Sequence, residues 1–354
     1  MRKITPPLFT LVLGVLTNLH STNCLADQQI GFSDPLITIM GRAQSLEKGA
    51  VLAGYPGVTF YTAFSGSNLK LNAQSSSDKT YIEAIVDNQP AQIFKLSTIP
   101  TDYEIKIPDG KKHQLQIINR AESWHGLVTF NSLTTNGEFS KTPPLSSRKI
   151  MVLGDSVTCA SSIDRKPNVK PDTDASNPRE SYGMLIAKSL NAQVHLVCMG
   201  GHGLVRTWDG FTDRLNVDEY YALTYPSTQQ KVFWNQASYQ PQLIISAIGT
   251  NDFNLGIPEH DFYVDTYIKF VLQLLADHKN AQIVITEGAI LNGEKKTALT
   301  AYLQETLKRV ADKRVHYIAS NNYPGEPIDA HPTKEEHAKM AQDFVPPLKK
   351  IMHW

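Results

Sequence analysis

The sequence has few cysteines and no surplus of charge, and both shortages narrow the class of protein. Only three cysteines occur in 354 residues, so a small domain held together by disulfides is excluded. The 34 basic and 34 acidic side chains balance, which gives no electrostatic reason to expect nucleic acid as a partner. With 41% hydrophobic and 19% charged residues, the chain is typical of neither a disordered segment nor a multispanning membrane protein. Small molecules or glycans remain as partners, and the length suggests about two domains.

Acidic residues are absent from the start of the chain, which has the pattern of an export signal. Two basic residues precede a short apolar run over residues 8–19. Because this run is too short to span a bilayer comfortably, we expect a signal peptide over residues 1–26, cleaved between Ala26 and Asp27. An uncleaved anchor is the alternative, and a lipoprotein signal is disfavoured because no small residue adjoins Cys24. The mature chain would be secreted or periplasmic, with a net charge of about minus two.

Two cysteines lie beyond this signal. Cys159 and Cys198 could form a disulfide in an oxidising compartment, or remain free as small buried hydrophobic residues. Neither belongs to a Cys-x-x-Cys motif or stands beside paired histidines, so we expect no structural metal.

The N-terminal half has the pattern of short antiparallel strands. Apolar and β-branched residues recur in runs that Gly, Asn, Asp and Pro separate, and no helical period of useful length occurs among them. The runs cover residues 36–39, 58–64, 81–86, 103–107, 114–118 and 127–130. We therefore expect a β-sandwich domain over residues 27–142.

The pattern changes after a linker rich in Pro and Ser. Compact apolar runs then alternate with segments of helical period, as in a parallel sheet covered by helices. Strands are expected at 150–153, 194–197, 243–248, 283–285 and 315–318, and helices at 182–190, 262–277, 299–311 and 334–351. A capping box from Thr333 to Glu336 marks the start of the last helix. An α/β domain is thus expected over residues 143–354, with a long polar loop at 161–179 that either covers a site or is mobile.

Four short motifs stand at the ends of elements in this second half. Ser156 follows the first strand in Gly-Asp-Ser, a glycine-rich turn around Gly201 follows the second, and Asn251 follows the third. His331 precedes the last helix, with Asp329 two residues upstream. Each motif alone is also typical of an ordinary turn or cap. Because the carboxyl ends of parallel strands meet at one edge of a sheet, we expect these groups to lie together.

The order Ser, Gly, Asn, His resembles the sequence blocks of the SGNH, or GDSL, hydrolases. Together with motifs of the first half, it makes the whole mature chain resemble carbohydrate esterase family two. Those motifs are Gly41-Arg42, Tyr55-Pro56-Gly57, Phe64-Ser65-Gly66, Ile85-Val86-Asp87 and His125-Gly126. The resemblance implies a jelly-roll sandwich followed by a flavodoxin-like, three-layer hydrolase domain.

Residue by residue, the resemblance implies roles for these motifs. Ser156 would be the nucleophile and His331 the general base, and the oxyanion hole would consist of the Ser156 N–H, the Gly201 N–H and the Asn251 side chain. The chemistry agrees, since a serine hydroxyl needs a base and a tetrahedral oxyanion needs preorganised donors. Asp329 is the natural third member of a triad. The alternative is a Ser-His dyad in which a backbone carbonyl orients His331 and Asp329 only caps the loop.

One position departs from the pattern of the family. Ala330 stands where relatives often carry an aromatic residue, so a platform for stacking a sugar could be missing. Trp208 or Trp234 could replace it, although a packing role is the favoured interpretation of each. His202, in the glycine-rich turn, is a further candidate, as an alternative base or as a residue that lines the cleft.

The sequence thus predicts an exported carbohydrate O-acetyl esterase that acts on acetylated xylan, glucomannan or a similar glycan. No cofactor is expected, and we expect a monomer without a membrane span once the signal is removed. A GDSL-type lipase or thioesterase is the alternative among enzymes. A non-catalytic carbohydrate-binding protein is the alternative outside them.

Overall fold

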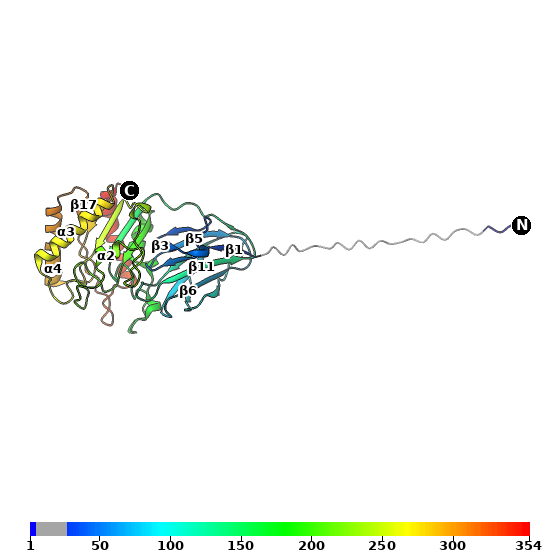
Figure 1. Cartoon of the computed structure of the whole chain (residues 1–354), viewed down its shortest axis with the longest axis horizontal. Coiled ribbons are helices and arrows are strands. Elements are labelled where there is room, and N and C mark those ends of the chain that lie inside the picture. The colour runs from blue at the N-terminus through cyan, green and yellow to red at the C-terminus, as the bar shows by residue number, and fades with distance from the viewer. Residues whose placement is uncertain (5–26) are drawn as a thin grey trace.

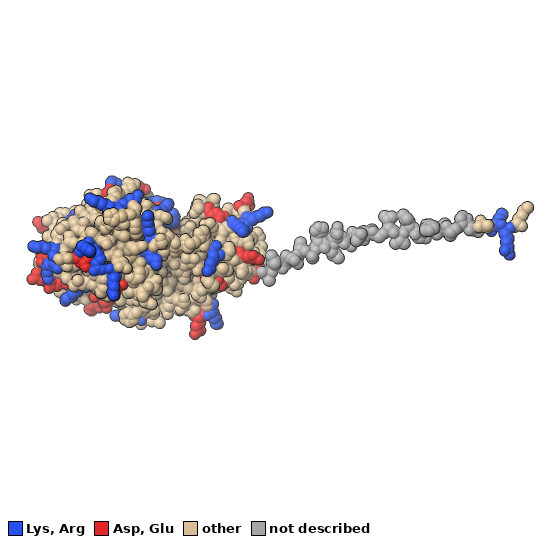
Figure 2. Space-filling view, turned by 90° about the horizontal axis from the view of Figure 1, so that it is seen from above, with Lys and Arg blue, Asp and Glu red and all other residues tan. Residues whose placement is uncertain are grey.

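The computed structural model describes residues 1–4 and 27–354. Residues 27–354 form a β-rich domain beside an α/β domain (Figure 1). The predicted signal peptide lies almost entirely outside the described residues and stays a prediction. In the part of the chain that is described, no helix has the length and apolar character needed to cross a membrane. Figure 2 shows basic and acidic side chains interspersed on the face in view.

The N-terminal domain is a sandwich of two antiparallel sheets, as the sequence predicts. One sheet has the order β3-β4-β11-β6-β9 with β1 beside β11, and the other has the order β12-β5-β10-β7-β8 with β2 beside β5. Aromatic side chains fill the space between the sheets, where the ring centroids of Phe60 and Phe130 lie 4.6 Å apart. The strands of the first sheet are β1 (Gln28–Gly31), β3 (Ala43–Ser45), β4 (Val51–Ala53), β6 (Lys70–Ser75), β9 (Thr101–Glu104) and β11 (Val128–Thr135). Those of the second are β2 (Thr38–Met40), β5 (Thr59–Phe64), β7 (Tyr81–Val86), β8 (Gln92–Lys95), β10 (His113–Asn119) and β12 (Phe139–Ser140).

The C-terminal domain contains a parallel sheet with the order β14-β13-β15-β16-β17. In chain order this is 2-1-3-4-5, the flavodoxin-like arrangement, so the expected fold class is confirmed. Strand β14 is added on one side of β13 and the later strands on the other side, so the strand order switches at β13. Ligands of such folds bind beyond the carboxyl ends of the strands at this switch point. The strands are β13 (Lys149–Gly154), β14 (Gln193–Cys198), β15 (Leu243–Ala247), β16 (Gln282–Ile285) and β17 (Val315–Tyr317).

Helices cover both faces of this sheet because alternate strand residues point to opposite sides. Ile150 and Val152 of β13 pack with α1 and α5, whereas Met151 and Leu153 belong to the core that includes α2, α3 and α4. The helices are α1 (Tyr182–Ser189), α2 (Val217–Tyr221), α3 (His260–Asp277), α4 (Gly293–Val310) and α5 (Lys334–Met352). Short 3₁₀ helices occupy Glu47–Gly49, Thr173–Ala175, Pro178–Glu180 and Gln236–Ser238.

Local sequence signals predict the start of some helices and not of others. The capping box is confirmed, since the Thr333 hydroxyl accepts the Glu336 N–H at 3.2 Å and the Glu336 carboxylate accepts the Thr333 N–H at 2.7 Å. Helix α4 begins at Gly293 rather than at the predicted Leu299. Helix α2 has only five residues, too few for a helical period to be visible in the sequence.

Buried side chains join the two domains. Arg42 of the sandwich is 1% exposed, and its guanidinium donates to the carbonyl oxygens of Tyr221 at 2.6 Å and Leu223 at 2.9 Å. The Tyr55 hydroxyl donates to the Tyr220 carbonyl at 2.5 Å. One apolar cluster runs from the interior of the sandwich to the side of the parallel sheet that α2, α3 and α4 cover. The sandwich is therefore fixed against the α/β domain.

Candidate active site

The ends of three neighbouring strands and the loop before α5 meet at one cavity. Its volume is about 820 Å³, and its lining includes Ser156 after β13, Gly201 after β14 and Asn251 after β15. His331 and Asp329 reach the same cavity from the loop that precedes α5. Parallel strands bring these residues together although the sequence separates them widely, as the order of the sheet requires.

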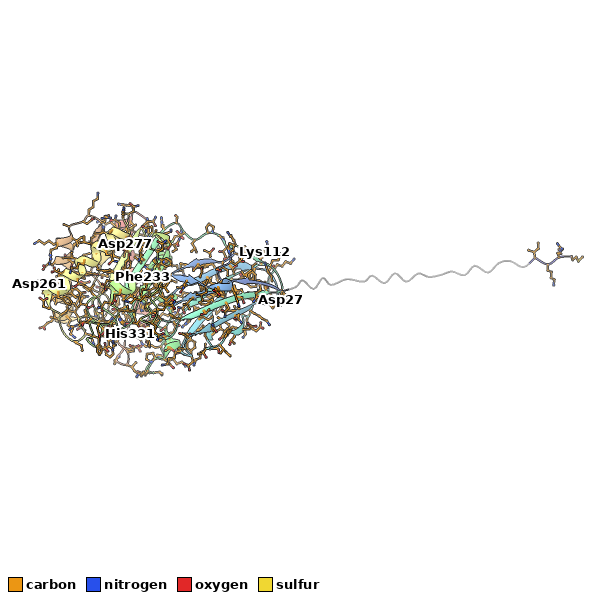
Figure 3. All side chains as sticks on the ribbon, viewed as in Figure 1. Asp27, Lys112, Phe233, Asp261, Asp277 and His331 are labelled. Carbon is orange, nitrogen blue, oxygen red and sulfur yellow. A yellow bond between two sulfur atoms is a disulfide. The ribbon has the colours of Figure 1, made fainter. Side chains whose placement is uncertain are left out.

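Ser156, His331 and Asp329 form a continuous hydrogen-bonded chain. The Ser156 Oγ lies 2.8 Å from His331 Nε2, and Asp329 Oδ1 lies 2.5 Å from His331 Nδ1. The same carboxylate oxygen accepts the backbone N–H of His331 at 3.3 Å. Figure 3 labels His331 within the α/β part of the molecule. An imidazole held in this way presents Nε2 to the hydroxyl as a proton acceptor.

The pKa values of the pair agree with these roles. Burial opposes ionisation of Asp329, but its hydrogen bond to His331 and the imidazole charge outweigh burial and lower the pKa of the carboxyl to about 2. Burial lowers the pKa of His331, yet the hydrogen bond and charge of Asp329 exceed that effect. More distant carboxylates at Asp155 and Glu122 add to it, so the pKa of His331 lies above its ordinary value. Asp329 is therefore ionised at neutral pH, and the Nδ1 proton points to it.

Three N–H donors lie beside the serine. Within residues 27–354, no hydrogen-bond acceptor lies against the backbone N–H of Ser156 or of Gly201. The Asn251 side chain donates one amide hydrogen to the His202 carbonyl at 2.9 Å, which leaves the second hydrogen of its NH2 group. Unsatisfied donors beside a nucleophile are suited to stabilise an oxyanion.

A buried carboxylate shapes the glycine-rich turn that carries one of these donors. Asp252 is fully buried and accepts the backbone N–H groups of Leu204 at 2.9 Å, Val205 at 2.7 Å and Arg206 at 3.2 Å. Burial raises the pKa of Asp252 to about 6, although these N–H groups oppose the increase. Gly201 itself has φ 77°, a left-handed conformation that favours glycine.

Cys159 and Cys198 form a disulfide. The bond joins the turn after Ser156 to the end of β14, so it connects two of the segments that border the cavity. Of the two alternatives for these cysteines, the structure has the paired form.

The sandwich domain also contributes to the cavity, through two residues that sequence reasoning did not single out. Glu122 and Trp124, in the segment after β10, both line it. Glu122 is 1% exposed and accepts the Gly200 N–H at 2.8 Å, whereas Trp124 is 59% exposed. The available signal was an acidic residue two positions before a tryptophan, directly after a predicted strand.

The long polar loop at 161–179 forms part of the wall. Ser161, Ser162, Lys170 and Pro171 line the cavity. The loop is attached to the sandwich because Asp164 accepts from the buried guanidinium of Arg120 at 2.9 Å. Of the two alternatives for this loop, the structure favours a role at the site.

Arg165, in the same loop, holds the segment that carries the histidine. Its side chain is 3% exposed, and its guanidinium donates to the carbonyl oxygens of His331 at 2.7 Å and Ser162 at 3.1 Å. The loop after Ser156 and the loop that carries His331 are thereby joined. Sequence reasoning did not single out this residue.

The remaining candidates divide into two groups. Trp208 lines the cavity and is 56% exposed, and Ala330 also lines it. Trp234 does not line the cavity, and its ring packs against the guanidinium of Arg42 at 5.3 Å, so of its two alternatives the structure has the packing role. The His202 ring is likewise absent from the lining, and its Nδ1 lies 2.5 Å from the Leu215 carbonyl oxygen, whereas the imidazole in contact with Ser156 Oγ is that of His331.

A serine whose proton can pass to an imidazole oriented by a carboxylate attacks carbonyl carbons, and donors placed beside it receive the charge that develops on oxygen. Fold and geometry together define a serine hydrolase of the α/β class. Comparison with known proteins agrees. Residues 39–144 match the model described as Carbohydrate esterase 2 N-terminal, and residues 152–343 match the GDSL-like Lipase/Acylhydrolase family.

Individual relatives narrow the family further. The acetylxylan esterase / glucomannan deacetylase of Cellvibrio japonicus (strain Ueda107) is 48% identical over 327 residues, which cover 92% of this chain and 91% of the relative. The structure of a family two carbohydrate esterase from Cellvibrio japonicus has a TM-score of 0.91 at 47% identity and covers 93% of this chain and 99% of that one. A second such structure, from Clostridium thermocellum, shares the fold with a TM-score of 0.84 at 24% identity, covering 90% and 99% of the two chains.

The chain therefore belongs to carbohydrate esterase family two, and it is an esterase.

Proposed function

We propose that the protein is an exported esterase that removes O-acetyl groups from a polysaccharide through an acyl-enzyme on Ser156. The observation that carries this proposal is the 2.8 Å contact between Ser156 Oγ and His331 Nε2, in line with the Asp329 carboxylate on Nδ1. Export rests on the signal-like pattern of residues 1–26.

In the first half of the reaction, His331 takes the proton of Ser156 as the Oγ attacks the acetyl carbonyl carbon. The charge on the carbonyl oxygen is stabilised by the N–H groups of Ser156 and Gly201 and by the Asn251 amide, each worth on the order of 3 kcal/mol of barrier. The ionised Asp329 stabilises the imidazolium. His331 then gives its proton to the sugar oxygen, which leaves as a hydroxyl group while the acetyl group stays on Ser156.

In the second half, water takes the place of the sugar hydroxyl. His331 removes a proton from the water, which attacks the acetyl carbon of the acyl-enzyme. Collapse of the second tetrahedral intermediate releases acetate and returns the proton to Ser156. The same donors serve both halves because the oxyanion forms at the same place.

The shape of the cavity supports a carbohydrate as the substrate. Its volume of about 820 Å³ has room for sugar rings, and two exposed tryptophans, Trp124 and Trp208, offer flat apolar faces at its wall. The name of the 48% identical relative favours acetylated xylan or glucomannan. Trp208 and Trp124 would then take the role of the aromatic residue that relatives often carry at the position of Ala330.

The test is acetate release from a panel of acetylated xylan, glucomannan and O-acetylated peptidoglycan, with Ser156→Ala as the matched control. Release from the plant polysaccharides by the wild type alone is expected. Hydrolysis of long-chain acyl esters or thioesters, with none of acetylated glycans, would favour a lipase or thioesterase. Binding of glycans without turnover of p-nitrophenyl acetate would instead indicate a binding protein. Export is tested separately by determining the N-terminal residue of the protein recovered outside the cytoplasm, which we expect to be Asp27.

A further inference from the structure

The segment after β10 brings one carboxylate of the sandwich into the active site of the other domain. Glu122 is 1% exposed. One of its oxygens, Oε2, accepts the backbone N–H of Gly200 at 2.8 Å, and the other, Oε1, accepts the hydroxyl of Ser161. A single side chain thus joins the glycine turn after β14 to the loop that follows the nucleophile.

The contact with Gly200 is close enough that a larger residue at that position would require the carboxylate to shift. A Cβ on Gly200 would lie 2.7 Å from Glu122 Oε2, inside the contact distance of the two atoms. The carboxylate therefore packs directly against the backbone of the turn. A buried carboxylate is unfavourable unless hydrogen-bond donors surround it, so the two donors fix where Glu122 lies.

The bond to Gly200 controls the direction of the next donor. Gly201 follows Gly200 immediately, and its N–H is one of the free donors beside Ser156. A hydrogen bond to the Gly200 N–H fixes the peptide group directly before the one that carries the Gly201 N–H. Since a donor stabilises an oxyanion only when it points to it, this bond bears on the reaction.

We propose that Glu122 is a positioning residue for the esterase reaction, through which the sandwich domain holds the Gly200–Gly201 turn so that the Gly201 N–H points to the acyl oxyanion. This inference rests on the proposed acyl-enzyme reaction. It makes the active site a joint product of both domains. A residue that acts in this way changes the transition state more than the binding of the sugar.

Three substitutions separate the position of the carboxylate from its charge. Glu122→Gln keeps the shape, since its carbonyl oxygen can accept from Gly200 and its NH2 can donate to Ser161 Oγ. Glu122→Asp keeps the charge but is one methylene too short to reach both partners. Glu122→Ala removes both bonds. Tyr55→Phe is the matched control, because it removes another buried bond between the domains, to the Tyr220 carbonyl, without lining the cavity.

The measurement is kcat and KM on p-nitrophenyl acetate, which contains no sugar, together with thermal unfolding. We expect Glu122→Ala and Glu122→Asp to lower kcat by roughly 10- to 100-fold with KM changed less than about twofold, and Glu122→Gln to stay within about fivefold of the wild type. Tyr55→Phe should retain the kcat of the wild type. If Glu122→Ala does not fold, Glu122→Asp and Glu122→Gln still give the comparison.

Two results would overturn the inference. In the first, Glu122→Asp keeps full kcat, which would mean that the position of the carboxylate does not matter. In the second, Glu122→Gln falls as far as Glu122→Asp, which would mean that hydrogen bonds from a side chain of this shape are not enough for the role. An inactive wild type with p-nitrophenyl acetate would contradict the proposed function itself, so the two failures are distinguishable.

Discussion

The guanidinium of Arg165 donates to the carbonyl oxygen of His331 at 2.7 Å, across 166 positions of sequence. The bond joins the backbone of His331 to the loop that follows Ser156. The distance between Ser156 and His331 therefore depends on a residue that touches neither reacting atom.

Arg165→Met should lower kcat by roughly 10- to 100-fold, because a small displacement of the base is enough to impair proton transfer. Arg165→Lys should restore little, since an ammonium group lacks the planar fork that reaches two carbonyl oxygens. Steady-state kinetics with circular dichroism would check both variants. Normal kcat in folded Arg165→Met would show that the histidine loop holds its place without this bond.

Ser156→Ala should abolish acetate release and leave the fold intact, because the side chain lies at a strand end and contributes little packing. The measurement is acetate release at high enzyme concentration, with circular dichroism as the control for folding. Activity above a few per cent of the wild type in a folded variant would require a different nucleophile.

Asn251→Ala should lower kcat by roughly 100-fold or more with little change in KM, because the amide donor acts on the oxyanion and not on the bound ester. Asn251→Asp is a useful companion, since it keeps the shape but places a negative charge beside the oxyanion. A change confined to KM would make Asn251 a residue of substrate binding.

The pH dependence of activity should depend on Asp329. His331 must be neutral to accept the proton of Ser156, so kcat/KM is low at acid pH and rises as pH passes the pKa of His331. That pKa lies above the ordinary value of 6.5, so the rise should lie above pH 6.5. Asp329→Asn removes the carboxylate that raises this pKa and leaves burial, which lowers it.

The acid limb of Asp329→Asn should therefore move to lower pH, while kcat falls by up to about 10⁴-fold. Profiles of kcat/KM from pH 4 to 9 would check both changes, with His331→Ala as the inactive control. If Asp329→Asn stays within about fivefold of the wild type and its limb does not move, a dyad oriented by a backbone carbonyl replaces the triad.

The disulfide should stabilise the α/β domain. Cys159 and Cys198 are 39 residues apart, and closing a loop of this size contributes about 2 to 4 kcal/mol to the free energy of unfolding. The double variant Cys159→Ala/Cys198→Ala should thus unfold at lower urea concentration than the oxidised wild type. Equal midpoints for the two proteins would mean that the pair contributes nothing.

The parts of the site that the sequence predicts are those with a local signal. Ser156, Gly201 and Asn251 follow short apolar runs that are typical of buried strands, and parallel strands bring their carboxyl ends to one edge. His331 precedes a helix whose capping box, Thr333 to Glu336, can be recognised from four consecutive residues. Neither inference requires knowledge of distant contacts.

The missed residues depend on partners that the sequence does not indicate. Glu122 binds a backbone N–H 78 positions away, and Arg42 binds a carbonyl 179 positions away. Every residue has backbone polar groups, so the sequence does not indicate which of these groups a distant side chain binds. The angle between the domains determines which backbone groups a side chain can reach. For the same reason Trp234 could not be assigned to the packing around Arg42 from its neighbours in the chain.

Arg42 also determines how the molecule comes apart. Its guanidinium is buried in the α/β domain while its backbone belongs to the sandwich, so neither domain can open without leaving unpaired polar groups and apolar surface on the other. The two halves should then melt in a single calorimetric transition. Heating would not release a folded hydrolase domain from the sandwich. Replacing the sandwich with that of a distant relative would lower the stability of both domains, not only of the sandwich.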